Sequence, residues 1–404
     1  MPNAQGLLKQ TVLAKQSALG TPATTGGKIK RRTNAIFTRN VDTYESNEIV
    51  SHQQSTGANA GIVKTAGKLD GLLSPTTWSE QFESLLRKQA AATTAITGLT
   101  LTIAASAPNW TITRAAGDFL TGGIKAGDVV RITAGAVNAA NLNKNMLVVS
   151  LTATVLTVRP VNGVAMASDT AVASCTISVP GKKIWVPTSG HTNDFWSIEE
   201  WYSDVPASEL YTDCKIGKAD VTIPATGNAT VSFDIPGLGR TRSATQQIAS
   251  PSAETTTNIL TAVNGVIFAN GLITPITGAQ LTINGNIAPG EAEVGTNSIS
   301  DLIRGEIMVS GSFTAKFSAT TLQALYDAQT VIKLFLVITD GSSGTADFIT
   351  FVMSAVKLFG DAPDDGEAKE IIRTYPFTAQ INGAGGTSLA DHQTIISIQD
   401  SQAV

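Results

Sequence analysis

The sequence predicts a mainly β protein that carries a flanking α-helix and an inserted, small antiparallel β domain. Along several segments apolar and polar residues alternate at period two, which is the pattern of strands with one buried face. Between residues 95 and 179, short β-branched runs alternate with Gly, Asn and Asp turns. An amphipathic stripe near residue 80 predicts the helix.

The clearest strands form a predicted hairpin at 218–237. Ala219, Val221 and Ile223 alternate with polar residues, a turn rich in Pro, Gly and Asn follows at 224–228, and alternation resumes over 229–235. One face of this hairpin should therefore be buried and the other polar. Runs of strand-forming residues predict further strands at 36–50, 263–268, 279–283, 305–316, 331–338, 348–358 and 371–381.

The predicted helix follows residue 74. Trp78, Phe82, Leu85 and Leu86 fall at positions i, i+4, i+7 and i+8, so they form one apolar stripe. A short amphipathic helix of this kind packs on a sheet. A second helix is predicted after Ser318, where Leu322 and Leu325 recur on one face.

The segment 95–180 differs from the rest because charge nearly disappears and five to seven short strands follow one another. An Ala/Thr run at 90–94 and Pro180-Gly181 bound the segment. Such punctuation indicates an inserted small antiparallel barrel or sandwich. We expect this module to lie on the outside of the molecule and to be removable.

The beginning of the chain is rich in Ala, Thr, Gln and Gly without a convincing period, which predicts an arm. A basic run at 28–32 and a polar loop at 52–59 follow. The predicted organisation is an N-terminal arm (1–33), a discontinuous main β domain (34–94 and 181–404) and an inserted outer β domain (95–180).

Composition excludes several classes of protein. Of the 404 residues 15% are charged, and 28 Lys and Arg against 32 Asp and Glu give a net charge of −4. This balance excludes a polycation that grips nucleic acid through its phosphates. Met1 to Gln10 lack a signal peptide, and no apolar run is long enough to span a membrane. We expect a chain made in the cytoplasm, with no membrane insertion.

Motifs for chemistry are missing from the sequence. No nucleophile elbow, zinc-protease motif, phosphate-binding loop or dinucleotide fingerprint appears. The adjacent acids Glu199/Glu200 and Asp364/Asp365 lack the context of a glycosidase pair. Three histidines without partner spacing are expected to be solvated: His52, His191 and His392. Cys175 and Cys214 predict two separate buried thiols. We therefore expect no enzyme, no metal and no cofactor.

A resemblance follows from the order of these features. Five successive features resemble those of the tail tube proteins of long-tailed bacteriophages. They are the strand 307–317, the helix at 322–327, the strand 334–338, the turn at Asp340-Gly341 with the strand 349–358, and Thr374 to Ala379. Residues 195–202 and the hairpin at 218–237 fit the same family. The inserted segment, with Lys125-Ala126-Gly127-Asp128, resembles a β domain found inside some members.

The resemblance implies a tail-tube β-sandwich whose subunits form six-membered rings. The rings would stack into a hollow tube that delivers the genome, within the tail of the virion and with no catalytic role. Implied partners are other copies of the chain, a tape-measure protein, tail terminator and tip proteins, and duplex DNA that passes without specific binding. The outer domain favours a tail without a contractile sheath.

Two segments that lack a core of their own are predicted to contact neighbouring subunits or rings. They comprise the basic cluster Lys28, Lys30, Arg31 and Arg32, and the polar loop with His52, Gln53 and Gln54. Nucleic-acid contact is the alternative for the basic cluster. For the whole chain, the alternatives are a strand-rich surface-layer or adhesin-type protein and a β-sandwich glycan hydrolase.

Overall fold

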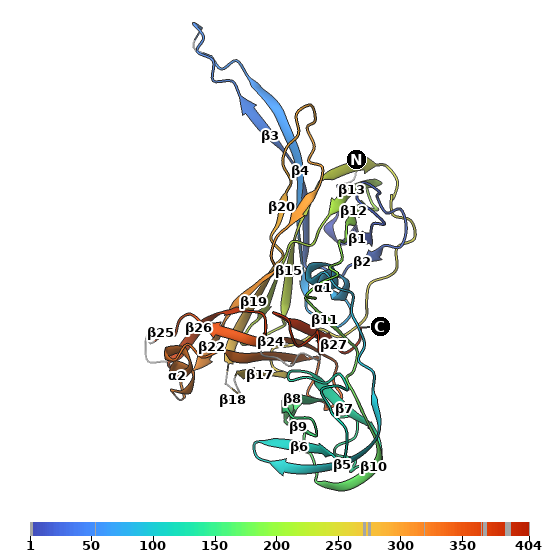
Figure 1. The fold of residues 1–404 in the computed structure, drawn as a ribbon. Helices are drawn as coiled ribbons and strands as arrows, with labels where there is room; N and C mark the ends of the chain where they lie inside the picture. The colour runs from blue at the N-terminus through green and yellow to red at the C-terminus, as the bar shows by residue number, and fades with distance from the viewer. Residues whose placement is uncertain are drawn as a thin grey trace.

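The computed structural model describes residues 3–52, 54–269, 272–273, 276–318, 320–364, 366, 370–383 and 389–403. It consists mainly of antiparallel strands, which confirms the predicted fold class. Figure 1 shows a long hairpin at one end of the molecule, a small barrel at the other end, and sheets between them.

The largest sheet runs through most of the main body. Its strands follow the order β18-β17-β23-β24-β26-β22-β19-β14-β15-β4-β3, with β11, β25 and β27 attached to it. The strands are β3 (Asn34–Glu45), β4 (Ala58–Leu72), β11 (Lys182–Trp185), β14 (Lys218–Ile223), β15 (Thr230–Gly237), β17 (Gly265–Ala269), β18 (Leu272–Ile273), β19 (Ile276–Asn284), β22 (Met308–Lys316), β23 (Ile332–Thr339), β24 (Phe348–Leu358), β25 (Ala362–Asp364), β26 (Ile372–Ala379) and β27 (Ser397–Asp400).

Helix α1 (Ser79–Leu86) packs on the apolar face of the large sheet and contacts two separate strands of it, β15 and β24. The ring of Phe82 contacts Phe233 of β15 at 5.4 Å and Phe351 of β24 at 5.9 Å, measured between ring centroids. Trp78 packs on Phe233 as well, at 5.5 Å. The predicted apolar stripe of the helix therefore fills the main core. The second predicted helix is α2 (Thr321–Asp327), of which Leu322 is buried.

A second, five-stranded sheet contains the beginning of the chain. Its order is β16-β13-β12-β1-β2, with β1 (Lys9–Lys15), β2 (Lys28–Ile29), β12 (Trp196–Tyr202), β13 (Ala207–Cys214) and β16 (Gly239–Ser243). The structure therefore differs from the predicted arm at 1–33. Val12, Leu13 and Ala14 are all buried, because both faces of β1 are covered, and consecutive buried residues leave no period-two signal.

The segment between the main strands forms a closed barrel in the order β10-β5-β6-β9-β8-β7. These strands are β5 (Ile96–Ser106), β6 (Asn109–Arg114), β7 (Val129–Ala134), β8 (Met146–Leu151), β9 (Val155–Pro160) and β10 (Asp169–Ser178). The barrel encloses its own apolar cluster. Short elements complete the description: η1 (Gly6–Leu8), η2 (Val161–Gly163), β20 (Ile287–Pro289) and β21 (Leu302–Arg304).

Both cysteines are buried and unpaired, as predicted. Burial raises the pKa of the Cys214 thiol well above its ordinary value, so this thiol is held in its neutral form. In the part of the chain that the structure describes, no helix has the length and apolar character needed to cross a membrane.

Candidate assembly surfaces

Along β4, β15, β14, β19 and β22, one face of the large sheet is polar and uncovered within the subunit. On β14, Ala219, Val221 and Ile223 point into the main core, while Lys218, Asp220 and Thr222 are half-buried on the other face. The same alternation continues on β15, β19 and β22. Helix α1 covers only the apolar face, so the opposite face is left open. We call this open side the polar face.

Charges on the polar face are arranged in two neighbouring cross-strand rows. In one row Lys68, Asp234 and Lys218 lie directly opposite one another on β4, β15 and β14. In the next row Asp70 and Asp220 flank Ser232. Each lysine of the first row therefore has an aspartate across from it on the neighbouring strand.

Short contacts hold these side chains in place. The Lys218 ammonium lies 2.7 Å from the Asp220 carboxylate. The Ser232 hydroxyl donates to Asp70, and the Thr282 hydroxyl donates to Asp220, both at 2.6 Å. The positive charges are locally compensated, and the carboxylates are oriented by hydroxyl donors.

Farther along the sheet the polar face carries hydroxyl and amide groups. Thr314 of β22 and Thr374 of β26 share a hydrogen bond of 3.0 Å across the strands. The remaining polar positions of this part are Thr222, Gln280, Thr282, Ser310, Ser312 and Thr378. Lys316 at the end of β22 pairs with Glu370 at 2.7 Å, and Ile36 and Met308 are exposed apolar side chains of this face. The surface is thus largely hydrophilic and nearly neutral.

The hairpin β3–β4 extends well beyond the body. Pairing of β4 with β15 ends at Thr65, whereas β3 and β4 remain paired as far as Glu45 and Ala58. Seven residues of β4 therefore run outside the sheet, which at about 3.4 Å per residue is a length of roughly 24 Å. From here on we call residues 40–64 the arm; this segment is distinct from the N-terminal arm predicted at 1–33. Figure 1 shows it projecting from the molecule.

Beyond Val63, which is bridged to Ser298, the arm exposes apolar side chains on a two-stranded ribbon. Tyr44 is 55% exposed and rests on Gly61, and Ile49 at the tip is fully exposed. His52 and Gln54 are exposed at the same tip, where the backbone N–H of Gln54 donates to His52 Nδ1 at 3.3 Å. Gln53 lies outside the described residues. The predicted polar loop is therefore the end of the arm.

The basic cluster is engaged inside its own chain. Lys28 pairs with Glu80 at 2.8 Å, and the Lys30 ammonium donates to the carbonyl of Thr77 at 2.9 Å. The guanidinium of Arg31 donates to the hydroxyls of Ser74, Thr77 and Thr257, and that of Arg32 donates to the carbonyl of Lys9. Burial lowers the pKa of Lys30 to about 8. These contacts fix β2 and its flanks to the start of α1.

The other candidate groups of the sequence analysis are dispersed. Glu199 is buried and accepts hydrogen bonds from the Ser208 hydroxyl and from the backbone N–H groups of Gln247 and Ile248. Glu200 pairs with Lys9. Asp364 is exposed on β25, and Asp365 lies outside the described residues.

The expectation of solvated histidines holds for His52 and His191, which are exposed, and is wrong for His392. Both ring nitrogens of His392 are buried, and burial together with the nearby Lys125 and Lys333 lowers its pKa. No group of three or more metal-binding side chains is found among the described residues.

The sequence analysis missed the paired charges of the polar face. Lys218, Asp220 and Asp234 lie on the predicted hairpin, but Lys68 and Asp70, which complete the two rows, come from β4, far away in the chain. The alternation of apolar and polar residues in the sequence predicted a polar face, but the alignment of its charges in rows across the strands is seen only in the structure.

Comparison with known proteins bears on these surfaces. The model of one protein family, described as phage tail tube protein, matches residues 6–379. No curated protein matches the chain.

Proposed function

The chain belongs to the phage tail tube protein family, and we propose that its subunits form six-membered rings that stack into a hollow tail tube through which the genome passes. A structural role in the tail follows from the family. The ring, the stacking and the passage of DNA are the proposal, and the observation that carries it is the uncovered polar face.

The polar face suits the wall of a channel. If each of six subunits contributed four strands, 24 strands at about 4.8 Å would give a circumference of roughly 115 Å and a diameter of at least ~37 Å. After side chains are subtracted, such a bore still admits duplex DNA. Closure would also remove the exposed edges of the sheet.

The charges of the polar face suit transport rather than binding. Each unpaired Lys or Arg on a channel wall would displace counterions from DNA and hold it. Here Lys218 is paired with Asp220, and Lys68 lies 3.8 Å from Asp70. Lys316 pairs with Glu370, and most other positions carry hydroxyl and amide groups, beside the exposed apolar side chains of Ile36 and Met308. A wall of this kind lets DNA slide.

Contacts between subunits are assigned to the arm. A two-stranded ribbon is marginal in water, so its exposed Tyr44 and Ile49 call for a covering surface. His52, Gln53 and Gln54 are the proposed contacts at its tip. Because Lys30, Arg31 and Arg32 are used within the chain, only Lys28, which is exposed, is left as a proposed contact from the basic cluster.

The barrel would decorate the outside of the tube, in line with the inserted outer domain proposed for 95–180. That position would occupy the surface a contractile sheath needs, so we propose a tail without a sheath. Further proposed partners are a tape-measure protein inside the tube and terminator and tip proteins at its ends. The proposed setting is the virion tail, after synthesis in the host cytoplasm.

Electron microscopy of the purified full chain tests the proposal. We expect hollow tubes built of six-membered rings, with β14, β15, β19 and β22 facing the bore. Sheets or lattices would instead support a surface-layer protein. Dispersed monomers, or tubes whose bore carries rings of unpaired Lys and Arg, would contradict the proposal.

A further inference from the structure

The barrel does not hang from the body by its two connections; it is seated on the outer strands. Its residues Ala126, Val129, Leu147, Val149 and Val161 share one buried apolar cluster with the body. On the body side this cluster contains Phe268 of β17, Phe335 and Val337 of β23, and Phe348 and Val352 of β24. We call this contact the seat.

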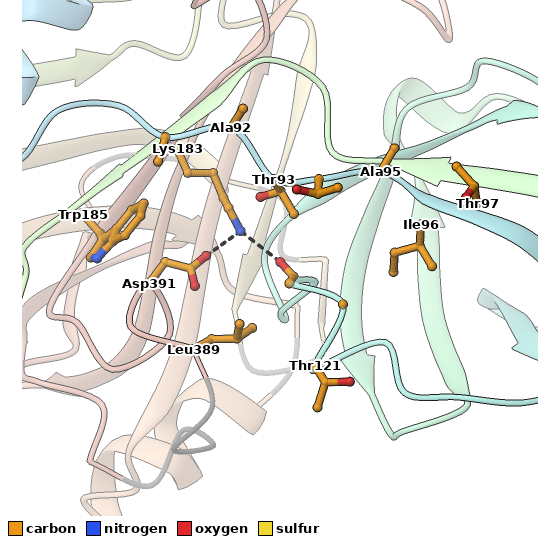
Figure 2. Close-up of a pocket in the computed structure, with 14 residues that line it drawn as sticks. Ala92, Thr93, Ala95, Ile96, Thr97, Thr121, Lys183, Trp185, Leu389 and Asp391 are labelled. Atoms are coloured by element: carbon orange, nitrogen blue, oxygen red, sulfur yellow. Dashed lines mark hydrogen bonds and ion pairs between the residues drawn. The ribbon is translucent and has the colours of Figure 1, made fainter.

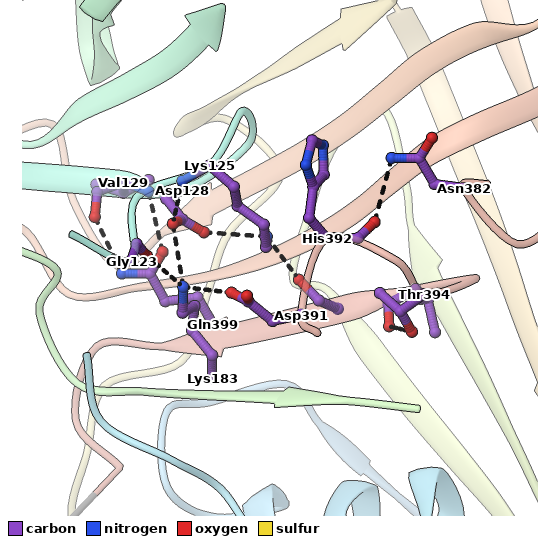
Figure 3. A network of polar contacts seen from close by, with 12 residues as sticks. Gly123, Lys125, Asp128, Val129, Lys183, Asn382, Asp391, His392, Thr394 and Gln399 are labelled. Carbon is purple, nitrogen blue, oxygen red and sulfur yellow. Dashed lines mark hydrogen bonds and ion pairs between the residues drawn. The ribbon is translucent and has the colours of Figure 1, made fainter. Parts of the chain in front are cut away.

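A group of buried charges lies beside the apolar part of the seat (Figure 3). The carboxylate of Asp128 receives the ammonium groups of Lys125 at 3.0 Å and Lys183 at 3.1 Å. Lys183, from β11 of the body, also pairs with Asp391. All four side chains are at least nine-tenths buried, and their formal charges cancel.

Two of these groups, Asp128 and Lys183, are held in their ionised forms by their charged neighbours. Burial alone would raise the pKa of Asp128, but Lys125 and Lys183 outweigh burial and hold this pKa below its ordinary value. Burial alone would lower the pKa of Lys183, and Asp128 with Asp391 raises it. Buried pairs of this kind contribute less to net stability than to fixing one arrangement of the groups they join.

The last strand of the body completes the seat. The side-chain amide of Gln399 on β27 accepts from the backbone N–H of Val129 at 2.9 Å and donates to its carbonyl at 3.1 Å. Lys125 donates to the hydroxyl of Ser397 at 2.9 Å. Figure 2 shows Lys183 directed towards Asp391 in a pocket of about 550 Å³ between barrel and body.

Gly127 permits the close approach. Its φ is +95°, and a Cβ atom there would lie 2.4 Å from Val352 Cγ1 and 3.2 Å from Phe335 Cε1. Even the smallest side chain would therefore push the barrel away from β24 and β23.

We infer that the barrel is a fixed brace of the main body, which folds as one unit with the outer strands and holds β27 in place. This inference replaces the expectation of a removable module, because removing 95–179 would uncover five apolar side chains of the body and leave Lys183 without Asp128. Only the assembly readout below rests on the proposed function.

The test compares glycine substitutions in the full chain. Gly127→Ala introduces a Cβ into the seat, whereas Gly163→Ala, also in the barrel segment at positive φ (+64°), meets nothing within 4 Å. Gly117→Ala adds a control whose φ (+89°) is closer to that of Gly127, and there the new Cβ meets only the guanidinium end of the Arg114 side chain.

We expect calorimetry of the wild type to show a single transition for barrel and body. Gly127→Ala should lower the Tm by several degrees, clearly more than either control, and should increase hydrogen exchange in β27 as well as in β7. Separate transitions for barrel and body, or equal effects of all three substitutions, would overturn the inference. So would an increase in exchange confined to β7.

The assembly readout separates this inference from the proposed function. Wild-type tubes imaged by cryo-electron microscopy should show the barrel as sharply as the wall, and Gly127→Ala tubes should show it blurred or should fail to form. A barrel that is blurred in wild-type tubes contradicts the brace alone. A wild-type protein that forms no tubes contradicts the proposed function. In that case calorimetry still tests whether the barrel and the body unfold in one transition, as the inference requires.

Discussion

The barrel and the arm both extend from the same body, but their apolar and charged groups have opposite environments: those at the seat of the barrel are buried, and those on the arm are exposed. In the seat, apolar side chains from barrel and body cover each other, and every charge is buried beside an opposite one. On the arm, Tyr44 and Ile49 face solvent, and Lys64 and Asp42 pair at 3.2 Å in the open. The difference separates groups that serve the folded subunit from groups that we propose to contact another subunit.

The largest effect should come from breaking the charge group of the seat. Asp128→Ala leaves Lys125 and Lys183 buried without their shared carboxylate, a change that costs on the order of 3–5 kcal/mol. Urea unfolding of the full chain measures it. The matched change on the arm, Asp42→Ala, removes an exposed partner and should cost at most about 1 kcal/mol. Similar losses at the two sites would remove the contrast between seat and arm.

Another buried cation, Lys30, extends the comparison to the N-terminal sheet. Its pKa is about 8 in the fold against 10.5 ordinarily, so between these values the unfolded chain binds more protons. Stability should therefore rise with pH above about 8, by about 2 kcal/mol between pH 7.5 and 9.5. Denaturant unfolding at the two pH values should show this rise in the wild type.

The neighbouring lysine supplies the control for that measurement. Lys30→Met should abolish most of the rise, and Lys28→Met, at an exposed position, should leave it intact. If both variants kept the full rise, the pH dependence would have another origin than burial of Lys30.

The smallest effect on stability is expected on the arm. Tyr44→Ser should change the free energy of unfolding by no more than about 0.5 kcal/mol, because the side chain is more than half exposed. The same change should raise the protein concentration needed for tube formation, measured by sedimentation and microscopy. Tyr44→Phe keeps the ring and should behave as the wild type does. Unchanged assembly of Tyr44→Ser would show that the arm is not an interface at this residue.

Local pattern was sufficient to predict the strands that have one covered face. The alternation at 218–235 appears in the structure as β14 and β15, and the stripe from Trp78 to Leu86 appears as α1. The barrel followed from turn spacing. In each of these cases the period of the sequence matches the geometry of a single element against a single core.

Contacts between residues far apart in the chain could not be predicted from the sequence. Val12 to Ala14 lack a period because β1 is covered on both faces, and Lys30 looks like a solvated cation until the carbonyl of Thr77 is placed beside it. Gly127 and Gln399 both shape the contact between barrel and body, although no motif in the sequence around either residue indicates this. Such pairs depend on how separate elements pack, and a run of residue types does not contain that information.

The separation between Val129 and Gln399 has a consequence for biosynthesis. These hydrogen-bond partners lie 270 residues apart. At about 5–20 residues per second, a ribosome needs roughly 15–50 s to pass from one to the other. During that interval the nascent barrel can close on itself and pack on β17, β23 and β24, but its seat stays incomplete, so a subunit reaches its full fold only after translation has passed residue 399.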